Sequence, residues 1–174
     1  MFLKRSLDAK HSIYVNRSFP KKFLPLKEFR HRVILGVGGN VGDVRRCMEH
    51  LLIYLDRLRQ VKVVQSGVIL KNPPFGYAEQ DDFYNTVLEI STSLPARVFL
   101  RVVWRIEKRF GRVRSFANAP RTLDLDMIFF DNQTIDYPEL KIPHPHWEKR
   151  SSVVIPLRSM TRNTIRRRYE NLNV

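Results

Sequence analysis

Two carboxylates one residue apart, Asp124 and Asp126, stand in residues 121–126 (RTLDLD), which read as the beginning of a strand. Because side chains alternate between the two faces of a strand, both acids should share one face, with Cα atoms about 6.5–7 Å apart. Mg²⁺ is commonly held by one or two carboxylates together with substrate phosphates. The pair predicts a magnesium site, where two ions could clamp a phosphoryl transfer. Two acids on an ordinary solvent-facing strand are the alternative.

Three arginines precede the acids within a short stretch: Arg112, Arg114 and Arg121. A guanidinium group can grip a phosphate with two parallel hydrogen bonds. Acids that need a cation, beside arginines that need an anion, suggest a site for a metal–polyphosphate complex. The alternative is mutual salt bridging, for example between Arg121 and Asp124.

Further along the chain stand two imidazoles, His144 and His146, and the guanidinium of Arg150. A zinc site is a poor interpretation, because no further Cys or His lies at ligand spacing. His144 could donate to a phosphate oxygen, or it could be a surface histidine. His146 is given no role.

Aromatic and amide side chains surround one predicted strand. Residues 72–76 (NPPFG) precede it, and Phe83 and Asn85 lie at its start. A flat heterocycle could stack and hydrogen-bond there, although core packing of Phe83 explains that residue equally well. The glycines around Asn40 lack the lysine and hydroxyl residues of a phosphate-binding loop, so they predict a tight turn with positive φ angles.

The elements that must position these residues follow from hydrophobic periodicity. We expect a strand at 33–37, a helix at 44–58 with Asp43 as N-cap, strands at 61–70 and 83–92, a helix ending at Gly111, a strand at 122–130, and short strands at 134–137 and 139–142. This order predicts an α+β fold of ferredoxin-like βαββαβ plan with additional C-terminal elements. The sheet is mostly antiparallel and the helices lie on one face.

Composition limits the function classes. The net charge is +14, and most of it lies at the two ends, in residues 1–32 and 158–174. We therefore divide the chain into a basic N-terminal extension, 1–32, expected to be a solvated arm, and a single domain, 33–174, with a short basic tail. No apolar stretch of about 18 residues predicts a membrane span. The single cysteine, Cys47, excludes an intrachain disulfide framework. A cytoplasmic monomer is expected.

Taken in order, these residues resemble the 6-hydroxymethyl-7,8-dihydropterin pyrophosphokinase family of folate biosynthesis. The matched segments are Gly38-Gly39-Asn40, residues 72–76 and 80–85, Glu107, Gly111-Arg112-Val113-Arg114, residues 120–126, Pro143-His144, Arg150 and Pro156-Leu157. The run at 120–126 (PRTLDLD) is highly specific to that family. The family's fold agrees with the plan derived above.

The resemblance implies a reaction in which ATP gives its pyrophosphoryl group to the pterin alcohol, with AMP and the pterin diphosphate as products. Asp124 and Asp126 would hold two Mg²⁺ ions, and with Arg112 and Arg121 they would form the catalytic set. The residues implied to contact ATP are Leu100, Glu107, Arg112, Arg114, Arg121, His144 and Arg150. Those implied to contact the pterin are Asn72, Pro73, Pro74, Phe75, Phe83 and Asn85.

The chain departs from the family's pattern at two places near the site. The loop between Arg114 and Arg121 is slightly short, and Ser152 stands where an aromatic side chain usually covers the second face of the pterin. A pterin- or nucleotide-binding protein without turnover is therefore one alternative. A nucleic-acid-binding module is another. It is disfavoured because the strands lack an RNP-type run and the basic residues cluster at the chain ends.

Overall fold

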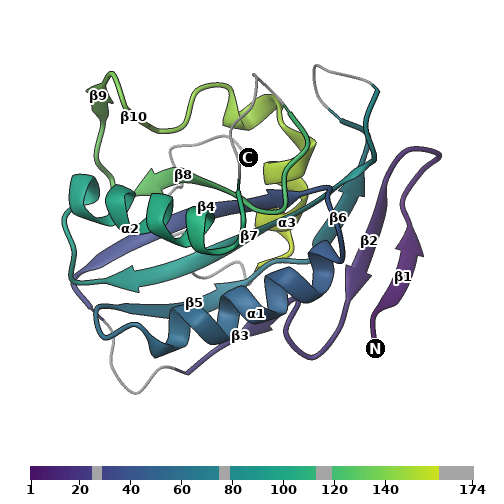
Figure 1. The fold of residues 1–174 in the computed structure, drawn as a ribbon, viewed down its shortest axis with the longest axis horizontal. Helices are drawn as coiled ribbons and strands as arrows, with labels where there is room; N and C mark the ends of the chain where they lie inside the picture. Colours follow the sequence, from purple (N-terminus) through teal and green to yellow (C-terminus); the bar gives the residue numbers. More distant parts are fainter. Residues whose placement is uncertain (25–28, 75–78, 113–118, 161–174) are drawn as a thin grey trace.

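A computed structural model describes residues 1–24, 29–74, 79–112 and 119–160. The strands are β1 (Leu3–Ser6), β2 (Ser12–Val15), β3 (Lys21–Lys22), β4 (His31–Gly39), β5 (Val61–Ser66), β6 (Ile69–Asn72), β7 (Phe83–Thr92), β8 (Asp124–Phe130), β9 (Ile135–Tyr137) and β10 (Leu140–Ile142) (Figure 1). The helices are α1 (Val44–Arg57), α2 (Ala96–Arg109), the 3₁₀ turn η1 (Trp147–Lys149) and α3 (Ser151–Arg158). Within the described residues, no helix is long and apolar enough to cross a membrane.

Eight of the described strands form one antiparallel sheet around the long strand β7. The order is β1-β2-β6-β7-β4-β8. Strand β5 pairs with the later part of β7, after the part that pairs with β6, and β3 pairs with β5. The expected single strand at 61–70 is wrong, because it is divided into β5 and β6 at Gly67. A Cβ atom at Gly67 would lie 2.5 Å from the carbonyl oxygen of Pro156, so this glycine lets α3 approach the sheet.

Local signals correctly predicted the two long helices. The side chain of Asp43 accepts a hydrogen bond from the backbone N–H of Arg46 and so caps α1, as expected. Pro95 precedes α2, and Gly111 follows its end with a φ of 80°, a conformation that costs glycine little. Both helices are amphipathic, and each buries one apolar stripe.

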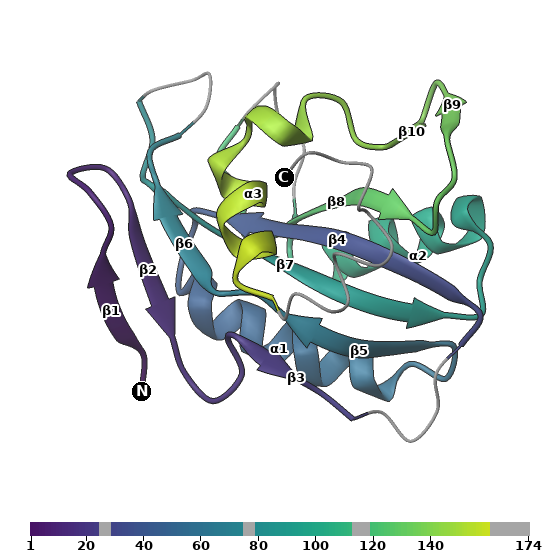
Figure 2. The same cartoon turned by 180° about the vertical axis from the view of Figure 1, so that it is seen from behind.

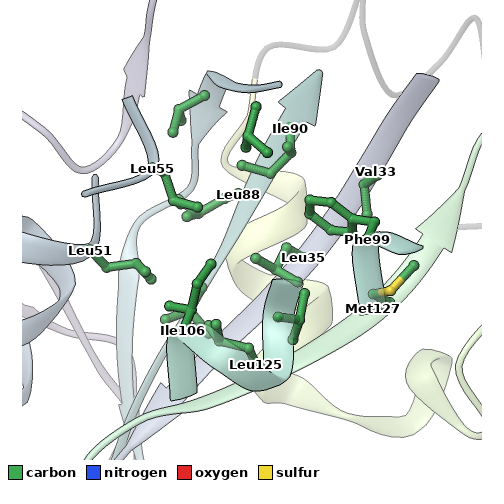
Figure 3. Close-up of a cluster of buried hydrophobic side chains, with 14 of the residues drawn as sticks. Val33, Leu35, Leu51, Leu55, Leu88, Ile90, Phe99, Ile106, Leu125 and Met127 are labelled. Atoms are coloured by element: carbon green, nitrogen blue, oxygen red, sulfur yellow. The ribbon is translucent and has the colours of Figure 1, made fainter. Parts of the chain in front are cut away.

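The main core lies between these helices and one face of the sheet (Figure 3). Leu51 and Leu55 of α1 and Phe99 and Ile106 of α2 meet inward side chains of β4, β7 and β8. The α+β class, the antiparallel sheet and the placement of α1 and α2 on one face are therefore confirmed.

A second, smaller core covers the opposite face. Helix α3, one of the additional C-terminal elements, lies across β7 and β6 on the side away from α1 and α2 (Figure 2). Val153 and Leu157 of α3 pack with Ile34 and Val87, and Trp147 packs edge-on against Phe129 at a centroid distance of 4.9 Å. The sheet is thus enclosed on both sides, and its edges and strand ends are left for polar chemistry.

The N-terminal segment is part of this sheet, so the expectation of a solvated arm is wrong for the described residues 1–24. Strand β2 pairs with β6, and β1 pairs with β2 at the outer edge (Figure 1). Phe19 is fully buried and Tyr14 is 8% exposed. The domain boundary at residue 32 stays a prediction, and the basic residues 161–174 lie outside the described part.

Candidate active site

The two acids of the site lie at the start of β8, where Asp124 pairs with Gly38 and Asp126 pairs with Gly36 of β4. Leu125 belongs to the main core, so the acids share the other face, as the alternation predicted. The side chain of Asp124 is 18% exposed and that of Asp126 is 41% exposed. Both carboxylates can therefore be reached by a ligand.

Arginines from three segments converge on these acids. Arg112 Nη1 lies 2.5 Å from Asp124 Oδ1, and Arg121 Nε lies 3.2 Å from Asp124 Oδ2. Arg150, at the start of α3, places Nη1 3.8 Å from Asp126 Oδ2. The predicted salt bridge between Arg121 and Asp124 is present, and the predicted gathering of acids and arginines is present with it. The cluster brings three guanidinium groups and two carboxylates to one strand end.

Glu107 holds this strand end in place. Its buried carboxylate pairs with Arg112, and its Oε1 accepts a hydrogen bond from the backbone N–H of Leu125 at 2.8 Å. Among the described strands β8 pairs only with β4, and α2 supplies this acceptor for its backbone. Burial raises the pKa of Glu107, opposed by the hydrogen bond from Leu125 and by the charge of Arg112. The family resemblance implied only a contact of Glu107 with ATP, because its contact with Leu125 joins two segments that are distant in the sequence.

The glycine-rich end of β4 allows close approach instead of the predicted tight turn. Strand β4 continues through Gly39, and only Gly42 in this segment has a positive φ, 74°. A Cβ atom at Gly38 would lie 2.5 Å from Asn85 Oδ1, and one at Gly39 would lie 2.6 Å from the carbonyl oxygen of Thr122. Glycine at position 38 therefore leaves room for the Asn85 side chain, and glycine at position 39 lets the backbone before β8 lie against β4.

Asn40, which follows β4, ties three segments of the site together. Its backbone N–H donates to the carbonyl of Arg121, and its Oδ1 accepts from the backbone N–H of Arg121, both at 2.9 Å. Its Nδ2 donates to Gln80 Oε1 at 2.9 Å and to the carbonyl of Asp81 at 3.1 Å. Asn40 thus positions the backbone of Arg121 beside the end of β4.

The predicted heterocycle residues gather where β6 ends and β7 begins. Asn85 Nδ2 donates to Asn72 Oδ1 at 2.8 Å, and Asn72 Nδ2 donates to the carbonyl of Pro73 at 2.7 Å. Phe83 is 8% exposed, and the guanidinium of Arg121 lies over its ring at 5.4 Å from the centroid. The aromatic and amide groups therefore adjoin the arginine cluster.

The remaining predicted residues lie in different surroundings. His144 is half-buried, and its backbone N–H donates to the carbonyl of Ile128, so the residue lies beside β8. Ser152 is half-buried in α3. Leu100 is buried in the main core. Phe75 and Arg114, for which contacts were predicted, lie outside the described residues.

The donor set fits magnesium. No group of three or more His, Cys, Asp or Glu side chains able to hold a metal by itself occurs in the described ranges. Two carboxylates at one strand end are nevertheless the protein contribution that Mg²⁺ commonly requires when phosphates and water supply its other ligands. Two such acids beside three arginines form a site suited to phosphoryl transfer.

Comparison with known proteins makes this class specific. Residues 34–162 match the family described as 7,8-dihydro-6-hydroxymethylpterin-pyrophosphokinase. A 2-amino-4-hydroxy-6-hydroxymethyldihydropteridine pyrophosphokinase of Helicobacter pylori is 40% identical over 147 residues, 83% of this chain and 90% of that protein. Proteins of the same name from Campylobacter jejuni (34% over 142 residues, 82% and 90% of the two chains) and Pseudomonas aeruginosa (36% over 126 residues, 72% and 78%) are also similar.

The chain belongs to the 7,8-dihydro-6-hydroxymethylpterin-pyrophosphokinase family. It is a diphosphokinase, a transferase whose pyrophosphokinase activity belongs to folate biosynthesis. The resemblance inferred from residues 120–126 is therefore confirmed.

Proposed function

We propose that the enzyme transfers the pyrophosphoryl group of ATP, with Mg²⁺, to the hydroxymethyl oxygen of 6-hydroxymethyl-7,8-dihydropterin. A bond forms between that oxygen and the β-phosphorus as the hydroxyl gives up its proton. The bond from the β-phosphorus to the oxygen shared with the α-phosphate breaks, and AMP leaves. The observation that carries this proposal is the meeting of Asp124 and Asp126 with Arg112, Arg121 and Arg150 at one strand end.

Asp124 and Asp126 would hold two Mg²⁺ ions, which when bound would neutralise phosphate charge and orient the reacting oxygens. Arg112 and Arg121 now pair with Asp124, and they can turn to phosphate oxygens once a cation satisfies that carboxylate. The same exchange is open to Arg150 at Asp126. Metal and polyphosphate would thus bind together: the metal would balance the carboxylates, and the phosphates would balance the arginines.

Further ATP contacts are proposed for His144, Glu107, Leu100 and Arg114 on the basis of the family resemblance. His144 is supported by its position beside β8. Glu107 would act at one remove, through Arg112 and the backbone of Leu125.

The pterin would bind beside the arginine cluster. Asn85 and Asn72 present amide groups for the edge of the ring, and Phe83 presents an aromatic ring for its face. Pro73, Pro74 and Phe75 would complete this contact. The strand order places these groups on β6 and β7, across β4 from the acids on β8. Two substrates could therefore be aligned from separate strands. Alignment of the reacting groups is a main source of rate in such a transfer.

The test is AMP formation from ATP and Mg²⁺ with and without the pterin alcohol, repeated with EDTA. We expect AMP only with the pterin present, and none with EDTA. In Asp126→Asn the rate should fall on the order of 10²–10³-fold because a charged metal ligand is lost. The matched control is Asp136→Asn on β9, whose exposed carboxylate pairs with Lys141 away from the site; it should keep the wild-type rate.

Pterin-independent AMP, or full activity in Asp126→Asn, would contradict the proposal. Binding of the pterin and an ATP analogue without AMP release would identify a binding protein that has lost turnover.

A further inference from the structure

The N-terminal hairpin, defined here as residues 2–15, is hydrogen-bonded to the strand that leads into the predicted pterin loop. Strand β2 pairs with β6 in the register Ser12 to Lys71, Ile13 to Leu70 and Tyr14 to Ile69. Strand β6 ends at Asn72, immediately before Pro73. The hairpin therefore extends the sheet beyond β6 (Figure 1).

Side chains reinforce this backbone pairing. The guanidinium of Arg45, in the first turn of α1, lies 5.3 Å from the ring centroid of Phe2, 4.9 Å from Tyr14 and 5.5 Å from Tyr84. The rings of Tyr14 and Tyr84 meet edge to face at 5.6 Å. Cation–π and edge-to-face contacts are both attractive, so one arginine joins the hairpin, α1 and β7.

Tyr84 is the link between this cluster and the site. It lies between Phe83 and Asn85, and strand alternation directs it to the α1 face while its two neighbours share the opposite face. Tyr84 packs against the main core, whereas Phe83 lies under Arg121 and Asn85 bonds to Asn72. Phe2, Tyr14 and Arg45 therefore contact Tyr84 or one another on one face of β7, while the proposed pterin contacts Phe83 and Asn85 lie on its other face.

An ion pair also joins the end of β6 to the residue that precedes β7. Lys71 Nζ lies 3.1 Å from Asp82 Oδ2, across the two strands that flank the loop. Lys71 stands opposite Ser12 of β2 on one side and opposite Tyr84 of β7 on the other. A shift of the hairpin would thus be transmitted to both β6 and β7.

We propose that Tyr14 and Arg45 are positioning residues for pterin binding. Through Tyr84 and β6, the hairpin holds Phe83, Asn85 and Asn72 in register for the heterocycle. The inference rests on the proposed function, because it takes these three residues to be the pterin contacts. It predicts a selective effect, since the hairpin joins the β6–β7 half of the sheet while Asp124 and Asp126, on which the arginines converge, lie on β8 beyond β4.

The experiment measures AMP formation in Tyr14→Ala and Arg45→Met, varying the pterin and ATP separately. We expect the pterin KM to rise about tenfold while the ATP KM stays within about twofold of wild type. Tyr14→Phe keeps the ring and should restore the wild-type pterin KM. The matched control is Tyr137→Ala, a similarly aromatic side chain that is 44% exposed on β9, and it should change neither KM.

Backbone hydrogen exchange gives a second readout that needs no activity. In Tyr14→Ala, the amides of Asn72, Phe83 and Asn85 should exchange faster, and those of Asp124 and Asp126 should be unchanged. Equal rises in both KM values, or an unchanged pterin KM in folded Tyr14→Ala or Arg45→Met, would overturn the inference. A wild-type protein without pterin-dependent AMP would instead defeat the proposed function, and the exchange data would still decide whether the hairpin positions β7.

Discussion

Strand β8 has carboxylates at both ends, and their partners differ in kind. At its start, Asp124 faces the guanidinium groups of Arg112 and Arg121, which are the tips of long side chains. Immediately after its end, Asp131 is held by the scaffold. Its Oδ1 accepts from the backbone N–H of Arg32 and its Oδ2 lies against His31 Nδ1, both at 2.7 Å.

Exposure does not separate the two acids, since the side chain of Asp124 is 18% exposed and that of Asp131 is 29% exposed. The partners separate them. A carboxylate bonded to backbone and to a buried imidazole cannot change partners without moving the sheet. A carboxylate bonded to flexible arginines can exchange them for a ligand's cation at little cost. The start of β8 therefore carries an acid whose side-chain partners can change, and its end carries an acid bonded to the backbone of β4.

The largest effect is expected for Asp124→Asn, which removes the charge of this side chain without changing its shape. We expect AMP formation to fall on the order of 10³-fold, because charge stabilisation at a transferring phosphoryl group is lost. The urea midpoint should stay close to wild type, since Arg112 keeps Glu107 and Arg121 keeps its backbone bonds to Asn40. A large loss of stability with retained turnover would show that Asp124 is a structural acid like Asp131.

The converse change is Asp131→Ala. It removes two hydrogen bonds to a charged acceptor and puts alanine at a φ of 47°, so the free energy of unfolding should fall by about 2–3 kcal/mol. Urea denaturation measures this loss. Asp131→Asn should lose less, because asparagine tolerates positive φ and can still accept from Arg32. Both variants should form AMP at the wild-type rate while folded; a rate loss with unchanged stability would join Asp131 to the active site.

The site was more predictable from sequence than its support. Alternation along β8 is a local property, so it placed Asp124 and Asp126 on one face and Leu125 in the core. The N-cap at Asp43 and the stop at Gly111 are equally local signals. The two Mg²⁺ ions, the monomeric state and the cytoplasmic location remain predictions.

The missed features are all consequences of contacts between distant segments. Strands β1 and β2 have four residues each, too few to show a clear period, and β2 becomes a strand by pairing with β6. Strand propensity depends on such context, so their sequence read as an arm. Gly38 and Gly39 looked like turn residues because the sequence does not show that the Asn85 side chain and the Thr122 backbone will approach them. The roles of Glu107 and Arg45 have the same origin.

The smallest expected effect concerns the acid that supports β8 from beneath. Burial raises the pKa of Glu107 above its ordinary value of 4.5, so the folded state holds the proton more tightly than the unfolded chain does. The resulting contribution to stability is complete below about pH 4.5 and is lost as pH rises through the folded pKa. Glu107→Gln can still accept the Leu125 hydrogen bond and does not titrate. Its stability relative to wild type should therefore increase between about pH 4 and pH 7, measured by urea denaturation.

Glu139→Gln provides a control of opposite sign. The pKa of Glu139 is lowered by its own backbone N–H and by Arg97, so wild type gains stability from this acid as pH rises, and the variant should fall behind over the same range. If Glu107→Gln also falls behind as pH rises, the ionised carboxylate is favoured in the folded state. Arg112 would then outweigh burial, and Glu107 would belong with the exchangeable acids at the start of β8 instead of the fixed scaffold beneath them.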